Sequence, residues 1–100
     1  MLDSLAEFPG GMNALKNYLR SSIKYPAKAR EEQKQGKVFV RFTVSATGKV
    51  TRPQVVKFMD EIFVSAVLPA FEKMPDWKPA KFGQTPVSVM FTIPISFVLK

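Results

Sequence analysis

The chain has 100 residues, 46% of them hydrophobic, and a formal net charge of +7 at pH 7; this length supports one domain with one modest core. It contains neither cysteine nor histidine, which excludes disulfides, thiolate metal sites and the Ser-His and Cys-His pairs of nucleophilic catalysis, so we expect no enzyme and no cofactor. No apolar run approaches the ~20 residues that span a bilayer, so we expect any membrane anchor to lie outside this sequence.

The positive charge is dispersed along the chain, without a compact basic block. A generally solvated positive surface is therefore favoured over a nucleic-acid site. The alternative function is a basic module that binds nucleic acid or another anionic polymer, with Phe39 and Trp77 as stacking platforms. The dispersed cations are Lys16, Arg20, Lys24, Lys28, Lys37, Arg41, Lys49, Arg52, Lys57, Lys73, Lys78 and Lys81.

The first part of the chain predicts an entry segment and two helices. Residues 1–11 end in Pro9-Gly10-Gly11 and are expected to be irregular, so the domain itself is assigned to residues 12–100. Apolar residues then recur every three or four positions over 12–23, which is typical of an amphipathic helix. Pro26 suits the first turn of a second helix over 26–35, which Gly36 is expected to close.

The middle of the chain predicts a β-hairpin. Residues 37–45 alternate apolar and polar side chains, as a strand with one buried face does. The sequence Ser45-Ala46-Thr47-Gly48 suits a connection with glycine in the left-handed conformation. The return strand over 49–57 contains Pro53 and is expected to be irregular and peripheral.

A third helix is predicted over 60–74, where apolar residues share one face. Pro69 lies inside it and is expected to kink it or split it in two. The connection Met74-Pro75-Asp76-Trp77-Lys78-Pro79 carries the only tryptophan, for which a core anchor is favoured over a ligand-stacking role. Residues 81–86 are expected to form a loop.

Residues 87–99 carry an apolar side chain at every odd position, which predicts a long strand with one buried face. Pro94 has no N–H to donate, so the strand is expected at a sheet edge. If the missing donor faces outward, Met90, Thr92 and Ser96 also direct their backbone groups outward. Geometry alone favours an edge that is merely tolerated, blunted by Pro94 and Lys100, over an edge that is used for binding.

These elements predict an α+β fold, in the order helix, helix, strand, strand, helix, strand. The three strands are expected to form one small antiparallel sheet with the helices packed on one face. The strand over 37–45 is expected in the centre, which leaves the outer side of the last strand open.

Six short segments, in order and spacing, resemble the C-terminal domain of TonB-type energy transducers. The resemblance covers roughly residues 8–99 and favours use of the last strand over mere tolerance. The segments are Tyr25-Pro26-Ala27-Lys28-Ala29, Gly36-Lys37-Val38, Val40-Arg41-Phe42-Thr43-Val44, Gly48-Lys49-Val50, Met74-Pro75-Asp76-Trp77-Lys78-Pro79 and Ile93-Pro94-Ile95-Ser96-Phe97.

The resemblance implies a periplasmic domain, normally tethered to the inner membrane by an N-terminal helix and linked through that part to a proton-channel complex. It implies that the domain grips the TonB box of outer-membrane transporters by strand addition and transmits proton-motive-force energy for uptake of nutrients such as siderophores and vitamin B12. No nucleic-acid partner is expected, and a homodimer through the last strand stays an alternative. The implied partner-binding residues are Met90, Phe91, Thr92, Ile93, Pro94, Ile95, Ser96, Tyr25 and Pro26.

Several positions depart from the family pattern. Lys34 stands where an apolar residue is usual, Phe58 and Met59 replace a small residue and its neighbour, and Pro69 replaces a helical polar residue. The segment before Tyr25 lacks the Gln and Pro residues that contact partners in the family, so those side-chain contacts do not carry over. These departures bear on helix packing and oligomeric state more than on the fold.

Overall fold

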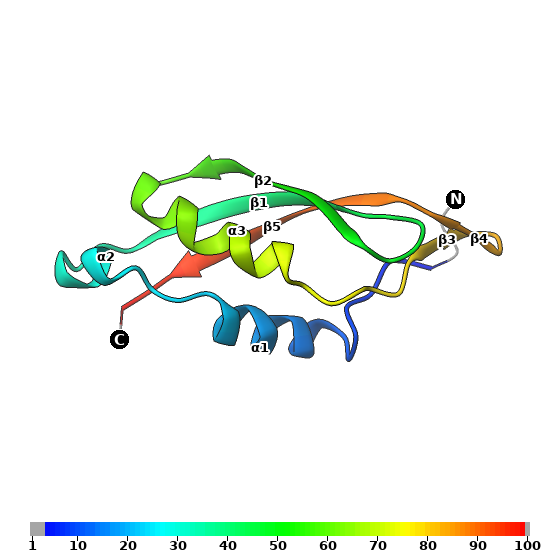
Figure 1. The fold of residues 1–100 in the computed structure, drawn as a ribbon, viewed down its shortest axis with the longest axis horizontal. Coiled ribbons are helices and arrows are strands. Elements are labelled where there is room, and N and C mark those ends of the chain that lie inside the picture. Colours follow the sequence, from blue (N-terminus) through cyan, green and yellow to red (C-terminus); the bar gives the residue numbers. More distant parts are fainter. Residues whose placement is uncertain (1–3, 100) are drawn as a thin grey trace.

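The computed structural model describes residues 4–99, which form an elongated molecule of 50 × 24 × 20 Å. Figure 1 shows the elements in space. In chain order they are α1 (Met12–Ser22), α2 (Ala27–Glu31), β1 (Gly36–Val44), β2 (Val50–Phe58), the 3-10 helix η1 (Glu61–Phe63), α3 (Val64–Glu72), β3 (Ala80–Phe82), β4 (Thr85–Val87) and β5 (Val89–Phe97). The expected role of Lys100 in blunting the last strand lies outside the described residues.

Strands β2, β1 and β5 form one antiparallel sheet in that order, so the predicted central strand and the predicted α+β fold are confirmed. Strand β1 alternates buried and accessible side chains along its length, because only one face of the sheet is covered by helices. In Figure 1, α3 crosses that face and α1 runs beside β5. The opposite face is open.

The core lies between this sheet face and the helices. Its centre is aromatic: Trp77 lies 5.6 Å from Phe42 and 5.5 Å from Phe91, ring centroid to ring centroid. Trp77 is only 7% exposed, and its indole N–H donates to the Met74 sulfur at 3.1 Å. This burial and these contacts confirm the prediction that Trp77 anchors the core. A side chain this large contributes to stability chiefly through the apolar surface that it buries.

The entry segment packs more closely than its composition indicates. The Glu7 backbone exchanges two hydrogen bonds with Lys78, of 2.9 and 2.8 Å, and Ser4 pairs similarly with Lys81. Phe8 is buried against Tyr18 and Trp77. Within residues 4–11 there are only isolated bridges and a turn. The domain boundary at residue 11 stays a prediction.

The second helix is shorter than predicted. The first helix is confirmed, whereas α2 ends at Glu31 and Gly36 begins β1 instead of closing the helix. Gln33 turns the chain with a φ of +54°, and the Lys34 amide donates back to the Ala29 carbonyl at 2.8 Å. A left-handed residue therefore ends this helical turn three positions earlier than glycine was expected to.

Pro69 does not split the third helix, so that part of the prediction is wrong, whereas a kink at Pro69 stays a prediction. The helical segment divides between Phe63 and Val64, where η1 passes into α3, and α3 continues through Pro69. The proline leaves the Ser65 carbonyl without its usual i+4 donor. Because Ser65 and Pro69 are both exposed, water can hydrogen-bond that carbonyl.

Residues 81–86 are not a loop, and the last strand is not continuous from residue 87. A second hairpin, β3 and β4, turns at Gly83, where φ is +64°. Val87 pairs with Ala80 in this hairpin, whereas Val89 pairs with Val44 in the main sheet. The long alternating pattern thus divides at Ser88 because its two parts have different partners, which periodicity cannot reveal.

Candidate functional site

The outer edge of β5 exposes a row of backbone groups. In β1, the Lys37 carbonyl accepts from the Met59 amide at 3.1 Å and the Ser45 amide donates to the Lys49 carbonyl at 2.9 Å. The odd-numbered residues of β1 therefore face β2, and the even-numbered ones face β5. Their partners in β5 are odd-numbered, without a register shift from Gly36↔Phe97 to Val44↔Val89.

It follows that the even-numbered residues of β5 direct their N–H and C=O groups away from the sheet. Met90, Thr92 and Ser96 can donate and accept there, and Pro94 can only accept. The side chains of the same residues lie on the open face of the sheet and are exposed. The edge thus offers hydrogen bonds of the main chain with little demand on a partner's side chains.

A groove of about 640 Å³ runs beside the C-terminal half of this edge, between α1 and β5. Its lining combines apolar side chains with three cations, and it includes no carboxylate. The Arg30 guanidinium lies 5.6 Å from the centroid of the Tyr25 ring. The lining residues are Lys16, Leu19, Arg20, Ile23, Tyr25, Arg30, Pro94, Ile95, Ser96, Phe97 and Val98.

The structure brings some of the predicted partner-binding residues together and separates others. Tyr25, Pro94, Ile95 and Ser96 line the groove, whereas Pro26 does not. The other predicted residues lie in β5 on the N-terminal side of the groove: Met90, Phe91, Thr92 and Ile93. Phe91, Ile93 and Ile95 turn their side chains toward the core and their backbone groups toward β1, so they are not offered at the edge.

Sequence reasoning missed the second wall of the groove. Lys16, Leu19, Arg20 and Ile23 belong to α1 or to its C-terminal cap, 70 or more positions from the end of β5. One feature of the sequence could have indicated a charged groove wall: Lys16 and Arg20 are spaced i and i+4, beside the apolar stripe of the predicted helix. Nothing in the sequence indicated which strand that helix would flank.

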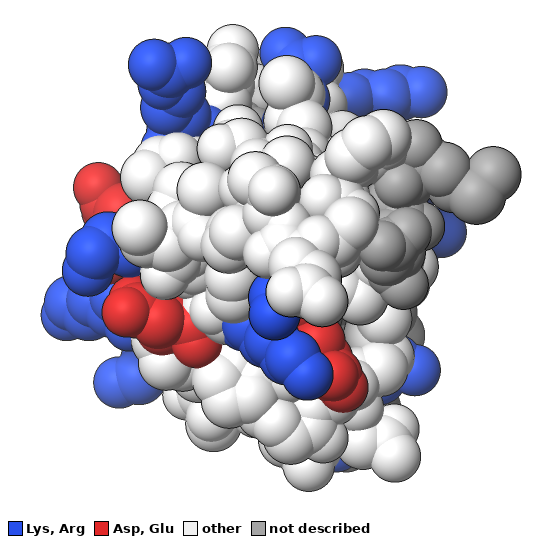
Figure 2. All heavy atoms as spheres, turned by 90° about the vertical axis from the view of Figure 1, so that its right-hand side faces the viewer, with Lys and Arg blue, Asp and Glu red and all other residues white. Residues whose placement is uncertain are grey.

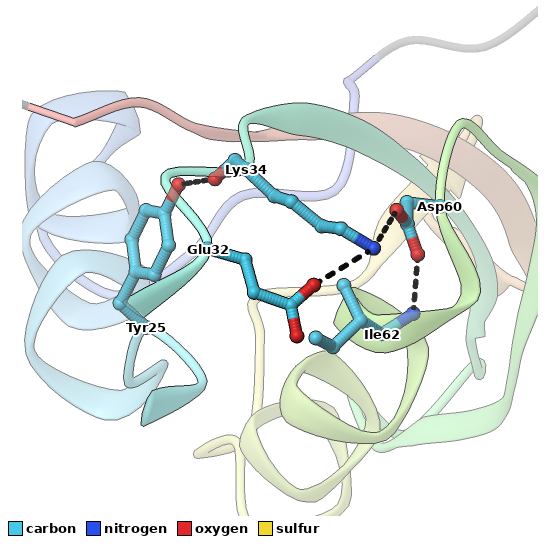
Figure 3. Close-up of polar contacts among 5 residues, drawn as sticks. All are labelled: Tyr25, Glu32, Lys34, Asp60 and Ile62. Carbon is cyan, nitrogen blue, oxygen red and sulfur yellow. Dashed lines mark hydrogen bonds and ion pairs between the residues drawn. The ribbon is translucent and has the colours of Figure 1, made fainter. Parts of the chain in front are cut away.

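A cluster of rings fixes the end of β5 next to the groove. Phe63 stacks on Phe97 at 4.4 Å between ring centroids, and Tyr25 contacts both rings edge-on at 5.8 and 5.6 Å. The Tyr25 hydroxyl donates a hydrogen bond to the Lys34 carbonyl (Figure 3). Tyr25 therefore has a packing role, whatever it contacts in a partner.

Lys34, which departs from the family pattern, joins this cluster to the start of η1. Its ammonium lies 3.2 Å from an Asp60 oxygen and 3.3 Å from a Glu32 oxygen. The other Asp60 oxygen accepts from the Ile62 amide at 3.0 Å, and these contacts are drawn in Figure 3. The hydrogen bond from the Ile62 N–H, and to a lesser extent the contact with Lys34, holds the pKa of Asp60 below its ordinary value. Asp60, and to a lesser extent Glu32, raises the pKa of Lys34.

We expect Asp60→Asn to lower the melting temperature slightly at pH 7. Asparagine keeps an acceptor for Ile62 but removes the charge that attracts Lys34. Because the pKa of Asp60 is lowered in the folded state, its contribution is present above its ordinary value of 3.8 and is lost as the pH falls through the folded-state pKa. The difference from wild type should therefore shrink on acidification, as thermal unfolding from pH 7 to pH 3 will show.

The matched control is Asp76→Asn. Its carboxylate lies 3.8 Å from the Lys49 ammonium, and both side chains are about two-thirds exposed. This variant should match wild type at every pH, since exposed pairs contribute little. An Asp60→Asn curve that coincides with wild type at pH 7 would contradict the assigned role.

The surface charge gives little support to a nucleic-acid site. Figure 2 views the molecule from the end that carries β3 and β4, where uncharged residues cover most of the surface and the scattered cationic residues, some beside acidic ones, form no continuous patch. Trp77 is buried and cannot act as a stacking platform, so that part of the alternative is wrong. Phe39 is half-buried, with the Lys57 ammonium 5.8 Å from its ring centroid. Among residues 4–99, no group of Asp and Glu could hold a metal ion.

The fold and the exposed strand define a small α+β domain that offers an unpaired sheet edge as a binding surface. The family model for the Gram-negative bacterial TonB protein C-terminal region matches residues 21–99. The chain therefore belongs to the TonB C-terminal domain family.

Two solved structures agree with this assignment. The chain is 30% identical to the Helicobacter pylori TonB C-terminal domain, residues 194–285, with a TM-score of 0.68 over 88% of this chain and 92% of that one. A longer form of that domain, residues 179–285, is also 30% identical, with a TM-score of 0.67 over 92% of this chain and 87% of that one. No curated protein sequence matched the chain.

The family determines the general role of this domain. TonB C-terminal domains are non-enzymatic, typically periplasmic parts of energy transducers that serve TonB-dependent transporters of the outer membrane. Within residues 4–99, no helix combines the length and apolar character needed to cross a membrane.

Proposed function

We propose that this domain binds the TonB box of outer-membrane transporters as an extra strand on the outer edge of β5. It passes on energy derived from the proton-motive force, from the periplasm, while an N-terminal part tethers it to the inner membrane and its proton-channel complex. The observation that carries the proposal is the outward row of backbone groups at Met90, Thr92, Pro94 and Ser96.

A comparison of the two edges of the sheet favours β5 over β2 as the binding edge. Strand β2 has two register shifts against β1, contains Pro53 and places Arg52 at a φ of +54°. A regular strand cannot pair along such an edge, because its donors and acceptors are out of phase. Strand β5 keeps regular pairing with β1 over its whole length, so its outer groups are also evenly spaced. Only β5 presents a regular ladder.

The groove favours certain side chains of the added strand. Successive residues of that strand point to opposite faces of the sheet, so alternate side chains enter the space beside α1. They meet the apolar side chains of Leu19 and Ile23 and the cations Lys16, Arg20 and Arg30. Apolar or acidic side chains therefore suit these positions, whereas the ladder contributes about 0.5–1.5 kcal/mol per hydrogen bond regardless of sequence.

The test is a titration with a synthetic peptide that copies the periplasmic N-terminal segment of an outer-membrane receptor from the same organism. The amide NMR signals of Met90, Thr92 and Ser96 should shift most, because their N–H groups acquire acceptors. Amides of β2 should stay in place. Absence of any shift along β5 at millimolar peptide would contradict the proposed function.

Thr92→Pro separates backbone from side-chain recognition. It removes an outward donor, and peptide affinity should fall about two- to tenfold, the equivalent of one hydrogen bond. Thr92→Ala, which keeps the N–H, should bind like wild type. If Thr92→Ala weakens binding as much as Thr92→Pro does, the threonine hydroxyl rather than the strand edge is recognised. Melting temperatures of both variants will show whether each is folded.

A further inference from the structure

Pro94 is the one feature inside β5 that interrupts its edge. The nine residues of β5 include no charged side chain, whereas β2 carries Arg52 and Lys57 in addition to Pro53. Met90 and Val98, each 65% exposed, add apolar surface to the β5 edge. A regular, uncharged edge of this kind pairs readily with any other strand, including its own copy.

We propose that Pro94 prevents β5 from pairing with β5 of a second copy while it leaves the edge open to a partner strand. The part of this inference that concerns a partner strand rests on the proposed function. The proposal thus predicts a monomer in place of the alternative homodimer through the last strand. Pro94 acts as the residue that selects a foreign strand over self.

The selection arises from counting lost hydrogen bonds. A foreign strand added to β5 meets one missing donor, at Pro94, and keeps the donors of Met90, Thr92 and Ser96. In a two-fold dimer each strand contributes its own proline, so two donors are lost from one ladder. If the prolines lie opposite each other, their rings also occupy the space between the strands.

Charge acts in the same direction. Each copy carries a formal net charge of +7, so two copies repel each other as their edges approach. The groove beside the edge adds Lys16, Arg20 and Arg30 to the positive charge near an approaching copy. A partner segment without net positive charge meets no such repulsion.

The experiment is Pro94→Ala, examined by sedimentation and by NMR without any peptide. Wild type should remain monomeric up to millimolar concentration. Pro94→Ala should dimerise as concentration rises, with the amide signals of Met90, Thr92 and Ser96 changing together. Pro53→Ala, on the irregular edge, is the matched control and should stay monomeric. Adding Thr92→Lys to Pro94→Ala should restore the monomer, because an edge lysine opposes strand pairing.

Two results would overturn the inference: wild type that already dimerises through β5, or folded Pro94→Ala that stays monomeric at millimolar concentration. Pro94→Val restores the same donor and replaces the alanine variant if that one does not fold. With receptor peptide, Pro94→Ala monomers should bind about two- to tenfold more tightly, as one added hydrogen bond implies. Self-association needs no transporter segment, so its outcome is independent of whether the receptor peptide binds.

Discussion

Replacing Phe63 with alanine is expected to lower the free energy of unfolding by about 3–5 kcal/mol. Phe63 is fully buried, and its ring stacks on Phe97 and meets Tyr25 edge-on. A cavity there removes these contacts at the point where η1, β5 and the turn before α2 converge. Urea unfolding followed by circular dichroism will measure the loss.

The same variant should weaken the binding edge. Phe97 is the last residue of β5, and its stacking on Phe63 holds the strand end beside the groove. We therefore expect faster amide exchange at Ile95, whose N–H faces β1, in Phe63→Ala, together with weaker peptide binding. Phe82→Ala is the matched control, since that ring is 55% exposed and should change stability by less than about 0.5 kcal/mol. Equal losses in the two variants would refute the assigned importance of Phe63.

The second large effect is expected at Gly48, where the first hairpin meets the tryptophan segment. The Trp77 amide donates to the Gly48 carbonyl at 2.6 Å, and Gly48 has a φ of +88°. A Cβ at this position would overlap the Trp77 carbonyl oxygen. The backbone contact and the dihedral angle both require glycine.

Gly48→Ala should therefore lower the free energy of unfolding by about 2–5 kcal/mol, from the left-handed conformation and the forced shift of the Trp77 backbone together. Gly83→Ala is the control, because Gly83 also has a positive φ, of +64°, but nothing lies within 4 Å of its added Cβ. It should cost only the conformational part, about 1–2 kcal/mol. Chemical denaturation of the pair isolates the contact, and equal losses would show that Trp77 does not constrain the turn.

The elements with strong periodicity were predicted well. The amphipathic helix α1 and strand β1 follow from the spacing of apolar residues, which depends only on which face of an element is buried. Strand β2 follows from the hairpin turn before it, and the edge position of β5 follows from one proline. The motifs around Tyr25, Trp77 and Pro94 indicated the family. The failures lie where local rules compete, as at Pro69, which an exposed helix face tolerates, and at Gln33, which turns the chain before Gly36.

The candidate site divides in the same way. Parity along one strand sufficed to predict which backbone groups of β5 face outward, since alternation is a local property of an extended chain. The groove was not predictable, because Lys16 and Arg20 come from a helix whose position beside β5 depends on packing of the whole core. The cluster of Tyr25, Phe63 and Phe97 likewise joins three separate segments.

The sequence by itself thus determined the fold class, the family and an edge strand with one missing donor, because periodicity, turn chemistry and the absence of cysteine and histidine are properties of the chain alone. Only the tertiary structure decided that the alternating run of residues 87–99 is shared between two sheets, that Trp77 is buried, and that cations of α1 flank the edge. These facts depend on which distant segments pack together, and a linear pattern does not encode its partner.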